Sequence, residues 1–358
     1  MSTTLLTLRE RLQTSLGDKK LIYADYYTDA INEASREIYP ILHKRVDYRQ
    51  LISDNILPNA HFQDWASTSY PDFYSLSNGT GTATTTSGLY RGGAKSAKVT
   101  AGTAADGYMY VSSNSYPRLL DLMGQEIDFK AWAYPEVADD AFLTIYTLQA
   151  NGTTQTLNST TTCPAGKWTL LALEDQSIND DIVQIDFRFR VHTTAKYAYF
   201  DNARAIGDSL YELLLPSDLQ KGHLSQAWLQ SSSYSDDPCD DINPKFDNQL
   251  FDWFISEDAG YKYLKPNETL SSAYLLELVG YSPLENLTAD TDTITLEDPK
   301  INLLIALAKY KLYQMVESIP AADDTSRYER ASARAYNEYL RLIPGNRMSI
   351  PSETIRIK

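Results

Sequence analysis

The chain has 358 residues, 43% of them hydrophobic and 22% charged, which are ordinary values for a globular protein of two or three domains. Its formal net charge is −15. This acidic balance argues against tight binding of nucleic acid, because affinity for phosphates comes from Lys and Arg, although an acidic surface can line a passage through which DNA slides. With two cysteines, no signal-peptide pattern and no apolar run near ~18 residues, we expect free thiols, no disulfide scaffold, no membrane span and synthesis in a cytosol.

Two helices are predicted in the first 50 residues. The first carries four leucines at spacings of three and four, so they share one helix face: Leu5, Leu8, Leu12 and Leu16. Gly17 would end this helix. The second is predicted over residues 23–39 and would end at Pro40.

Residues 53–207 have a different character. They are rich in Thr, Ser, Gly, Tyr and Asn, and their short alternating runs are separated by turn signals, as in an all-β sandwich. Segment 183–191 alternates strictly, with one apolar face and one face that carries Gln, Asp and two Arg. This pattern predicts a strand of a sheet with one buried face.

Acidic residues dominate the next segment, 207–300, which holds about −13 of the net charge by its Asp, Glu, Lys and Arg content. Here we predict a hairpin of strands 251–263, with a break at Gly260, and 273–281, with its turn at Lys265–Glu268. A helix is then expected to begin at Asp298 and to end near Pro320, because Asp and Pro favour helix starts.

The last predicted helix covers 325–343 and ends at Pro344–Gly345. An amphipathic helix pair cannot bury its stripe alone, so we expect the N- and C-terminal pairs to pack together as one small bundle. The predicted fold class is therefore multidomain α+β, a helical bundle with a β-hairpin region and an inserted all-β jelly-roll sandwich. The expected boundaries are 1–53 and 207–343 for the body, 54–206 for the sandwich, and 344–358 for an extended tail.

The β segment resembles the carbohydrate-binding modules related to families 4 and 9. Asn55–Trp65 is similar to their opening motif, Gly92–Val99 to a following strand, Trp168-Thr169 to a later one, and Tyr199–Arg204 to the closing strand. The match spans about 150 residues in the expected order, and it implies a jelly-roll sandwich.

The helical segments resemble tailed-phage head–tail adaptor proteins, which are also called head-completion or connector proteins. Tyr26–Ala34 is similar to their opening helix, and Val279–Leu284 and Ile294–Leu296 resemble the hairpin and the approach to the long helix. The resemblance covers about half the chain. It implies a ring, commonly dodecameric, fixed under the portal protein, with the C-terminal tail reaching a neighbouring subunit.

Sugar binding on such a sandwich would need aromatic rings on an exposed face with polar neighbours. Tyr108 and Tyr110 are two residues apart and so share a strand face. The candidate carbohydrate-binding residues are Trp65, Tyr74, Tyr90, Tyr108, Tyr110 and Trp132. The alternative is that the tryptophans are core residues and the tyrosines serve packing or an interface.

A structural calcium ion is a second question raised by the resemblance. In these modules a carboxylate usually follows the opening Phe, whereas Gln63 stands there in this chain. Asp201 matches the usual ligand from the last strand. Calcium takes about six to eight oxygen ligands, and we can name one, so we expect no cofactor and leave calcium at Asp201 as an alternative.

Two groups of residues are candidates for intersubunit contacts. Four arginines recur beside the apolar face of the last helix: Arg327, Arg330, Arg334 and Arg341. The acidic 207–300 segment offers them an opposite charge, while the alternatives are a solvated face and contact with DNA phosphates. In the tail, Ile350, Ile355 and Ile357 alternate with polar residues, which favours docking on a neighbour over disorder.

No active-site pattern is present, since the histidines lack zinc-ligand spacing and there is no nucleophile motif or phosphate loop. We therefore expect a non-enzymatic structural protein of the virion neck, made in the host cytoplasm. It would form a ring that joins the portal to the next neck or tail ring, let DNA pass without specific binding, and display a sandwich able to bind surface glycans. The rival hypotheses are a carbohydrate-binding accessory protein or glycoside hydrolase fragment, and a tail-fibre attachment protein.

Overall fold

The computed structural model describes residues 3–16, 26–83, 89–103, 106–159, 162–207, 212–231, 245–267, 274–296, 298–317 and 325–348. The chain forms two compact units. The helical unit consists of Met1–Val46, Lys221–Ser225 and Val279–Lys358, and the β unit consists of Asp47–Gln220 and Gln226–Leu278. None of the helices in the described ranges is long and apolar enough to cross a membrane.

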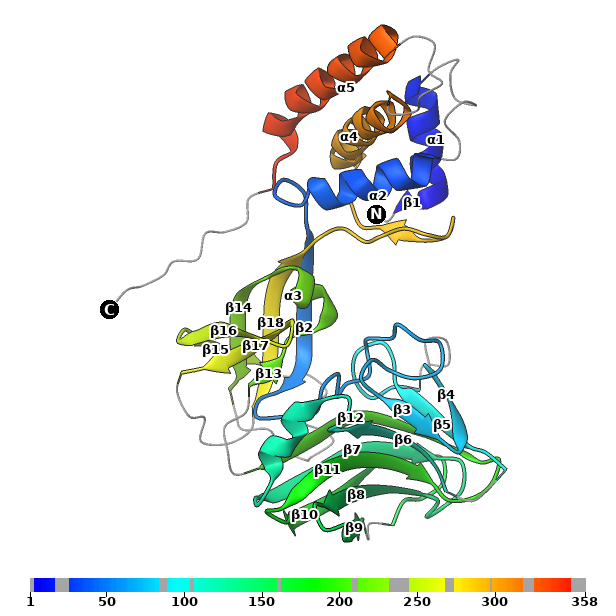
Figure 1. Ribbon diagram of the computed structural model, residues 1–358, viewed down its shortest axis with the longest axis vertical. Coiled ribbons are helices and arrows are strands. Elements are labelled where there is room, and N and C mark those ends of the chain that lie inside the picture. Colours follow the sequence, from blue (N-terminus) through cyan, green and yellow to red (C-terminus); the bar gives the residue numbers. More distant parts are fainter. Residues whose placement is uncertain are drawn as a thin grey trace. The chain divides into compact units, whose positions relative to one another are not determined.

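Four helices from the two ends of the chain form the core of the helical unit (Figure 1). They are α1 (Leu5–Leu16), α2 (Tyr27–Glu37), α4 (Asp298–Glu317) and α5 (Thr325–Asn346). Four leucines of α1 are buried and share one cluster with Ile31 of α2 and Leu304 of α4, namely Leu5, Leu8, Leu12 and Leu16. The two helix pairs therefore bury their apolar stripes against each other, as the spacing of those stripes predicted.

Helix α5 is longer than the sequence indicated, because it continues through Pro344 to Asn346. Proline removes one backbone donor from this last turn. The N–H of Arg347 still donates to Ile343 at 3.0 Å and closes the helix end.

A two-stranded sheet and a buried asparagine connect the N- and C-terminal parts of the helical unit. Strand β1 (Thr3–Thr4) pairs with β19 (Thr293–Ile294). Asn32 on α2 donates from its side chain to the carbonyl of Leu287 at 2.7 Å and accepts from the N–H of Leu287 at 2.9 Å. Asn32 thus satisfies both backbone groups of a residue far away in the sequence.

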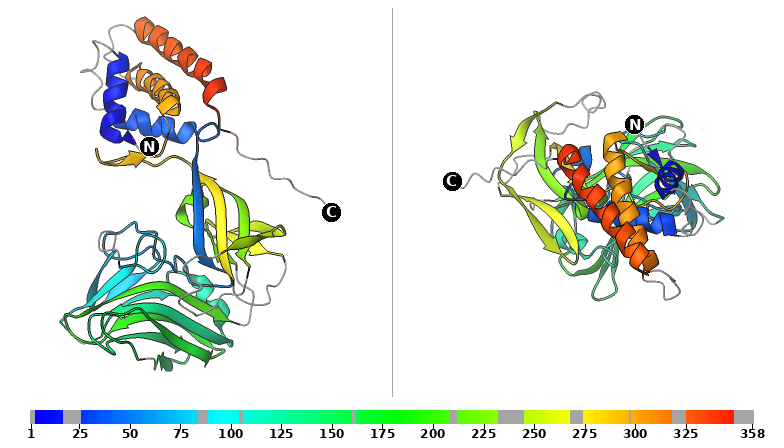
Figure 2. Two further views of the ribbon diagram at one scale, coloured as in Figure 1. Left: turned by 180° about the vertical axis from the view of Figure 1, so that it is seen from behind. Right: turned by 90° about the horizontal axis from the view of Figure 1, so that it is seen from above.

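The β unit contains a sandwich of two five-stranded sheets (Figures 1 and 2). One sheet has the order β10 (Thr169–Ser177), β7 (Glu126–Pro135), β12 (Tyr197–Gly207), β5 (Ala97–Ala101) and β4 (Gly79–Ala83). The other has the order β3 (Ser75–Ser77), β6 (Gly107–Ser112), β11 (Ile182–Val191), β8 (Ala141–Gln149) and β9 (Thr154–Asn158). All described ladders within them are antiparallel.

Aromatic rings fill the space between the two sheets. Phe129 of β7 lies edge-on to Phe187 and Phe189 of β11, with ring centroids 4.9 and 5.4 Å apart. Phe200 of β12 meets Phe189 at 5.5 Å. A short 3-10 helix (Pro117–Leu122) adds buried leucines to this core. The predicted multidomain α+β fold class, with a helical part and an all-β sandwich, is confirmed.

The chain also contains two smaller sheets. One has the order β13 (Leu213–Leu214), β17 (Tyr261–Pro266) and β16 (Trp253–Asp258), and the other β15 (Phe246–Leu250), β14 (His223–Gln230), β18 (Leu275–Ser282) and β2 (Lys44–Ile52). A short helix, α3 (Ser217–Lys221), precedes β14.

The predicted hairpin in this region is wrong in the position of its turn and in the strands that pair. The turn lies at Ala259–Gly260, whose φ angles are 51° and 83°, and Trp253 pairs with Pro266 across β16 and β17. Two consecutive left-handed residues build a two-residue hairpin turn, and Gly supplies that conformation without strain. The second predicted strand, β18, pairs instead with β14 and β2.

The acidic segment also lies in a different unit from the one expected. Most of residues 207–278 belong to the β unit rather than to the helical body. Tyr263 is part of the sandwich core, and the ring of Tyr261 lies 5.4 Å from that of Phe73. Arg118 pairs with Glu212 at 3.1 Å. Aromatic packing and ion pairing therefore attach this segment to the sandwich.

The thiol of Cys163 is free and buried, and burial raises its pKa to about 11. A thiol with so high a pKa is almost entirely protonated at neutral pH and unreactive. Cys239 lies outside the described residues.

Candidate functional site

The outward side of the sheet β3-β6-β11-β8-β9 carries a cluster of aromatic and charged side chains. Successive residues of β11 point to opposite sides, so Phe187 and Phe189 enter the core while Arg188 and Arg190 point outward. We call this outward surface the first face. Its central residues are Tyr108, Tyr110, Phe142, Tyr146, Arg188 and Arg190.

Strand register decides which residues meet on the first face. Arg190 lies opposite Tyr108 of β6 on one side and Phe142 of β8 on the other. Arg188 lies opposite Tyr110 and Thr144. Arg190 is thus flanked by aromatic rings from both neighbouring strands, and Arg188 by a ring on one side and a threonine on the other.

The two guanidinium groups lie over aromatic rings of the first face. The guanidinium of Arg188 is 3.9 Å from the ring centroid of Tyr146 and 5.0 Å from that of Tyr108. That of Arg190 is 4.8 Å from Phe142. The rings of Tyr108 and Tyr110 are 5.6 Å apart. Cation–π contacts and a tilted ring–ring contact hold these side chains in a half-buried layer.

Each arginine also has one carboxylate partner. Arg188 donates to Asp186 at 2.7 Å, and Arg190 donates to Asp106 at 2.8 Å. A ring nitrogen of His192 lies 2.6 Å from the other oxygen of Asp106. The two positive charges are therefore balanced locally, and the guanidinium planes are fixed in orientation.

The predicted sugar-binding residues divide into two groups. Tyr108 and Tyr110 share the first face, as their spacing predicted. Tyr74 is instead 2% exposed in the core, where its hydroxyl donates to Pro58 at 3.1 Å. Trp65 packs against the core and donates to Phe62 at 2.6 Å.

Trp132 and Tyr90 lie away from the first face. Trp132 is on β7 of the opposite sheet and is 4% exposed, because the guanidinium of Arg91 stacks on its ring at 3.6 Å. Tyr90, which precedes Arg91, is exposed. The site residues that sequence reasoning missed are Arg188, Arg190, Phe142 and Tyr146. The strict alternation of β11 did mark the arginines as outward, but no sequence signal placed β8 beside them.

Asp201 does not have the surroundings of a calcium ligand. One of its oxygens accepts from the backbone N–H of Arg91 at 2.6 Å and of Gly92 at 3.0 Å, and the other from Asn202 at 2.8 Å. Burial raises the pKa of Asp201 to about 7, opposed by these hydrogen bonds. Its oxygens therefore anchor the 91–92 loop to β12.

Gln63 occupies the place where the resemblance would have a carboxylate. Its amide nitrogen donates to the carbonyls of His61 at 2.6 Å and Lys95 at 2.8 Å, and its oxygen accepts from Ala94 at 2.8 Å. A Cβ on Gly93 would lie 2.6 Å from this amide, so the fit is close. The two carbonyl oxygens nearest this amide therefore already accept from an N–H donor.

Among the described residues, no group of three or more His, Cys, Asp or Glu side chains could hold a metal ion. Together with the engaged oxygens around Asp201 and Gln63, the residues present do not fit calcium.

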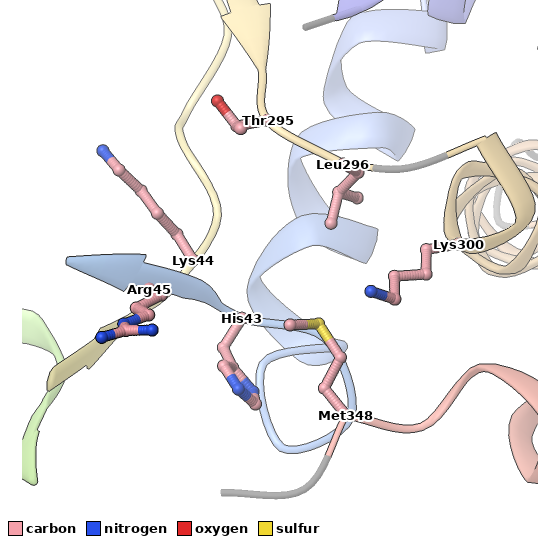
Figure 3. A pocket seen from close by; sticks show the side chains of 7 residues that line it. All are labelled: His43, Lys44, Arg45, Thr295, Leu296, Lys300 and Met348. Atoms are coloured by element: carbon pink, nitrogen blue, oxygen red, sulfur yellow. The ribbon is translucent and has the colours of Figure 1, made fainter. Parts of the chain in front are cut away.

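A cavity of about 290 Å³ opens in the helical unit (Figure 3). It is lined by His43, Lys44, Arg45, Thr295, Leu296, Lys300 and Met348. Lys44 is paired with Glu285 at 3.1 Å, and burial together with nearby Lys300 lowers the pKa of His43. The lining holds cations but no carboxylate and no nucleophile beside a base, so it can attract an anionic group but offers no catalytic arrangement.

The predicted intersubunit residues are only partly described. Arg330, Arg334 and Arg341 are exposed on α5, and none of them forms an ion pair with a described residue. The side chain of Arg327 and the tail residues Ile350, Ile355 and Ile357 lie outside the described part of the chain. Their role in an assembly stays a prediction.

No protein-family model matches the sequence, and no curated protein matches it. Solved carbohydrate-binding modules with a β-sandwich fold are similar to part of the chain. One is the C-terminal family 22 carbohydrate-binding module of Clostridium thermocellum Xyn10B, at 15% identity and a TM-score of 0.36, covering 44% of this chain and 98% of that one.

Two further modules show the same level of similarity. The CBM22-1 xylan-binding domain from Paenibacillus barcinonensis Xyn10C has 12% identity and a TM-score of 0.34, covering 47% of this chain and 99% of that one. TmCBM61, solved in complex with β-1,4-galactotriose, has 12% identity and a TM-score of 0.30, covering 44% of this chain and 100% of that one. At these identities and scores, none of them assigns a ligand to this chain.

Proposed function

We propose that this protein binds carbohydrate on the first face of its sandwich. The observation that carries the proposal is the pair of guanidinium groups that lie over the rings of Tyr146 and Phe142, beside the ring pair Tyr108–Tyr110. Binding sites for small ligands combine apolar and aromatic surface with a few fixed polar groups. Sugars need that combination, because they have apolar C–H faces and hydroxyls around their edges.

The balance of charge favours an uncharged glycan. Asp186 and Asp106 each neutralise one arginine. A guanidinium paired with a carboxylate still has N–H groups for sugar hydroxyls, and Asp106, which is 33% exposed, has lone pairs that accept from them, whereas Asp186 is buried beneath Arg188. The first face can therefore exchange hydrogen bonds with hydroxyls without attracting a net charge.

Binding without hydrolysis is part of the proposal. Glycoside hydrolysis generally uses two carboxyl groups with separate roles as acid and as base or nucleophile. On the first face, Asp186 is engaged by Arg188 and by Gln184 at 2.9 Å, and Asp106 by Arg190 and His192. Neither carboxylate is held ready to exchange a proton with a glycosidic oxygen.

The test is a glycan array with the full-length chain, followed by titration with the best neutral oligosaccharide. Tyr108→Ala should weaken binding by roughly tenfold to thirtyfold, because truncating an aromatic anchor costs about 2 kcal/mol. Tyr336→Ala, which removes an exposed tyrosine from the helical unit, should leave binding unchanged. Equal affinity of the Tyr108 variant and the parent chain would refute the proposal, as would reducing-end release on incubation.

A second candidate function concerns the helical unit. We propose that it attaches the sandwich to a larger particle, as an adaptor ring of a tailed-phage neck between the portal and the next ring. Two observations favour it. The four helices from both chain ends share one core, and the exposed side of α5 carries Arg330, Arg334 and Arg341. The adaptor resemblance itself is confined to the sequence motifs.

Mass measurement of the isolated chain tests this second function. A closed ring, or a copy number in purified particles equal to that of the portal, would support an adaptor, whereas a trimer would support a fibre attachment protein. A monomer absent from particles would leave the accessory-protein alternative. Removal of residues 345–358 should weaken assembly more than folding.

A further inference from the structure

The opposite sheet of the sandwich carries a second row of aromatic rings on its outward side. The row crosses the strands, from Trp168 just before β10, through Tyr134 of β7 and Tyr199 of β12, to Lys98 of β5. Tyr199 lies directly opposite Tyr134 on one side and Lys98 on the other. We call this row, together with Tyr197, the second face.

The members of the row are in continuous contact. The rings of Trp168 and Tyr134 are 5.6 Å apart, and those of Tyr134 and Tyr199 are 6.0 Å apart. The ammonium of Lys98 lies 4.0 Å from the ring centroid of Tyr197 and 5.6 Å from that of Tyr199. Tyr199 is 6% exposed and forms the floor, while the other side chains of the row are half-buried.

Core packing does not account for this row. The neighbouring residues of the same strands, such as Ala133, Phe200 and Val99, are the ones that enter the core, because strand residues alternate between faces. Trp168 is instead positioned at the surface by a turn. The N–H of Gly166, whose φ is +67°, donates to Pro135 at 2.9 Å and brings the turn beside the hydroxyl of Tyr134.

The unbalanced charges along the second face are positive. Lys98 has no carboxylate within ion-pair distance among the described residues, and neither has the exposed Lys167 next to Trp168. The nearby Glu136 is already paired with Lys196 at 2.9 Å. In a chain of net charge −15, an aromatic row with an unpaired lysine at each end is a local reversal of charge.

We propose that the second face is a separate binding site for an acidic glycan, a chain of sugars that carry carboxylates. Sugar rings stack on Trp168 and Tyr134 over the floor of Tyr199, and sugar carboxylates pair with Lys98 and Lys167. This site is on the other sheet from the first face and does not depend on it. It differs from that face in charge, because the arginines there are neutralised by carboxylates.

Titration of the full-length chain with a linear oligogalacturonate tests the proposal, with the carboxyl-reduced form of the same oligosaccharide as the matched neutral ligand. The acidic form should bind more tightly, and its affinity should fall as salt is added, because ion pairing is screened. Tyr134→Ala should weaken binding by about tenfold, whereas Tyr134→Phe, which keeps the ring, should retain it. The double variant Lys98→Gln, Lys167→Gln should remove most of the salt dependence.

Tyr108→Ala separates the two faces and should leave oligogalacturonate binding unchanged. If Tyr108→Ala abolishes that binding and Tyr134→Ala does not, the acidic ligand occupies the first face and the second-face proposal is overturned while glycan binding stands. Equal affinity for the acidic and reduced forms, or no binding of oligogalacturonate at all, also overturns it. Loss on Tyr134→Ala with rescue by Tyr134→Phe supports it, whatever the outcome for neutral glycans.

Discussion

Asn32 and Leu287, which are 255 residues apart in the sequence, exchange two hydrogen bonds in the core of the helical unit. Asn32 is 8% exposed. It lies in the short motif that resembles the opening helix of head–tail adaptors. A polar residue in that motif has a physical reason here, because its amide satisfies the N–H and the C=O of a buried backbone position.

Replacement of Asn32 should therefore be costly. Asn32→Leu leaves both backbone groups of Leu287 without a partner, and each unsatisfied buried group costs about 1–3 kcal/mol. We expect urea unfolding to show a loss of about 3 kcal/mol. Asp29→Asn, on the exposed side of the same helix, is the control and should change stability by less than about 1 kcal/mol. A similar small effect for both would contradict this role of Asn32.

Arg188 and Asp186 should behave as a coupled pair. Asp186 is 2% exposed, so Arg188→Gln would leave its carboxylate buried with Gln184 as its remaining partner. Breaking a buried pair on one side costs about 3 kcal/mol. The double variant Arg188→Gln, Asp186→Asn should recover part of that loss, and a double-mutant cycle in denaturant measures it. Strict additivity of the two single changes would show that the pair is not coupled.

Because of Gln63, we expect calcium to have no effect on the thermal stability of the chain. Neither calcium chloride nor a chelator is expected to shift the midpoint of thermal unfolding of the parent chain, because the local carbonyls are bound by the Gln63 amide. Gln63→Ala should lower stability by about 2 kcal/mol, since those carbonyls and the N–H of Ala94 lose their partner. A rise of the midpoint with calcium in the parent chain would show that a cation site exists after all.

Asp201 should give stability a dependence on pH. Burial raises its pKa in the folded chain to about 7, from the ordinary value of 3.8. At a pH between these two values, the folded state holds a proton on Asp201 that the unfolded state has released. The contribution of Asp201 to the free energy of unfolding is therefore complete below pH 3.8 and is lost as the pH rises toward 7. Other carboxyl groups titrate too, so the parent chain must be compared with Asp201→Asn.

In Asp201→Asn the side chain at position 201 cannot ionise. The free energy of unfolding of this variant should therefore fall less than that of the parent chain as the pH is raised from 4 to 7, a range that lies between the two pKa values. The readout is the difference between the two chains at each pH in denaturant titrations. A difference that stays constant with pH would mean that the folded Asp201 keeps the pKa of an unfolded chain.

Local patterns in the sequence determined the elements of this protein. The spacing of Leu5, Leu8, Leu12 and Leu16 defines a helix face, and the alternation of segment 183–191 defines which residues share a strand face. Helical and strand periodicities are properties of neighbouring residues, so they can be read without knowing the rest of the fold. The hairpin turn was missed because Ala259–Gly260 competed with the turn-like residues that follow Lys265.

Pairing between strands that are distant in the sequence decided the arrangement of the first face. The position of Tyr146 and Phe142 under Arg188 and Arg190 depends on the register of β8 against β11, which no short pattern encodes. Trp132 lies on an outward strand face but is buried, because a loop residue from elsewhere, Arg91, covers it. The sequence by itself determined which side chains share a face of one helix or strand, whereas only the tertiary structure decided which faces are covered and which rings and charges from different strands meet. The physical reason is that burial and contact across strands come from residues that are distant in the chain.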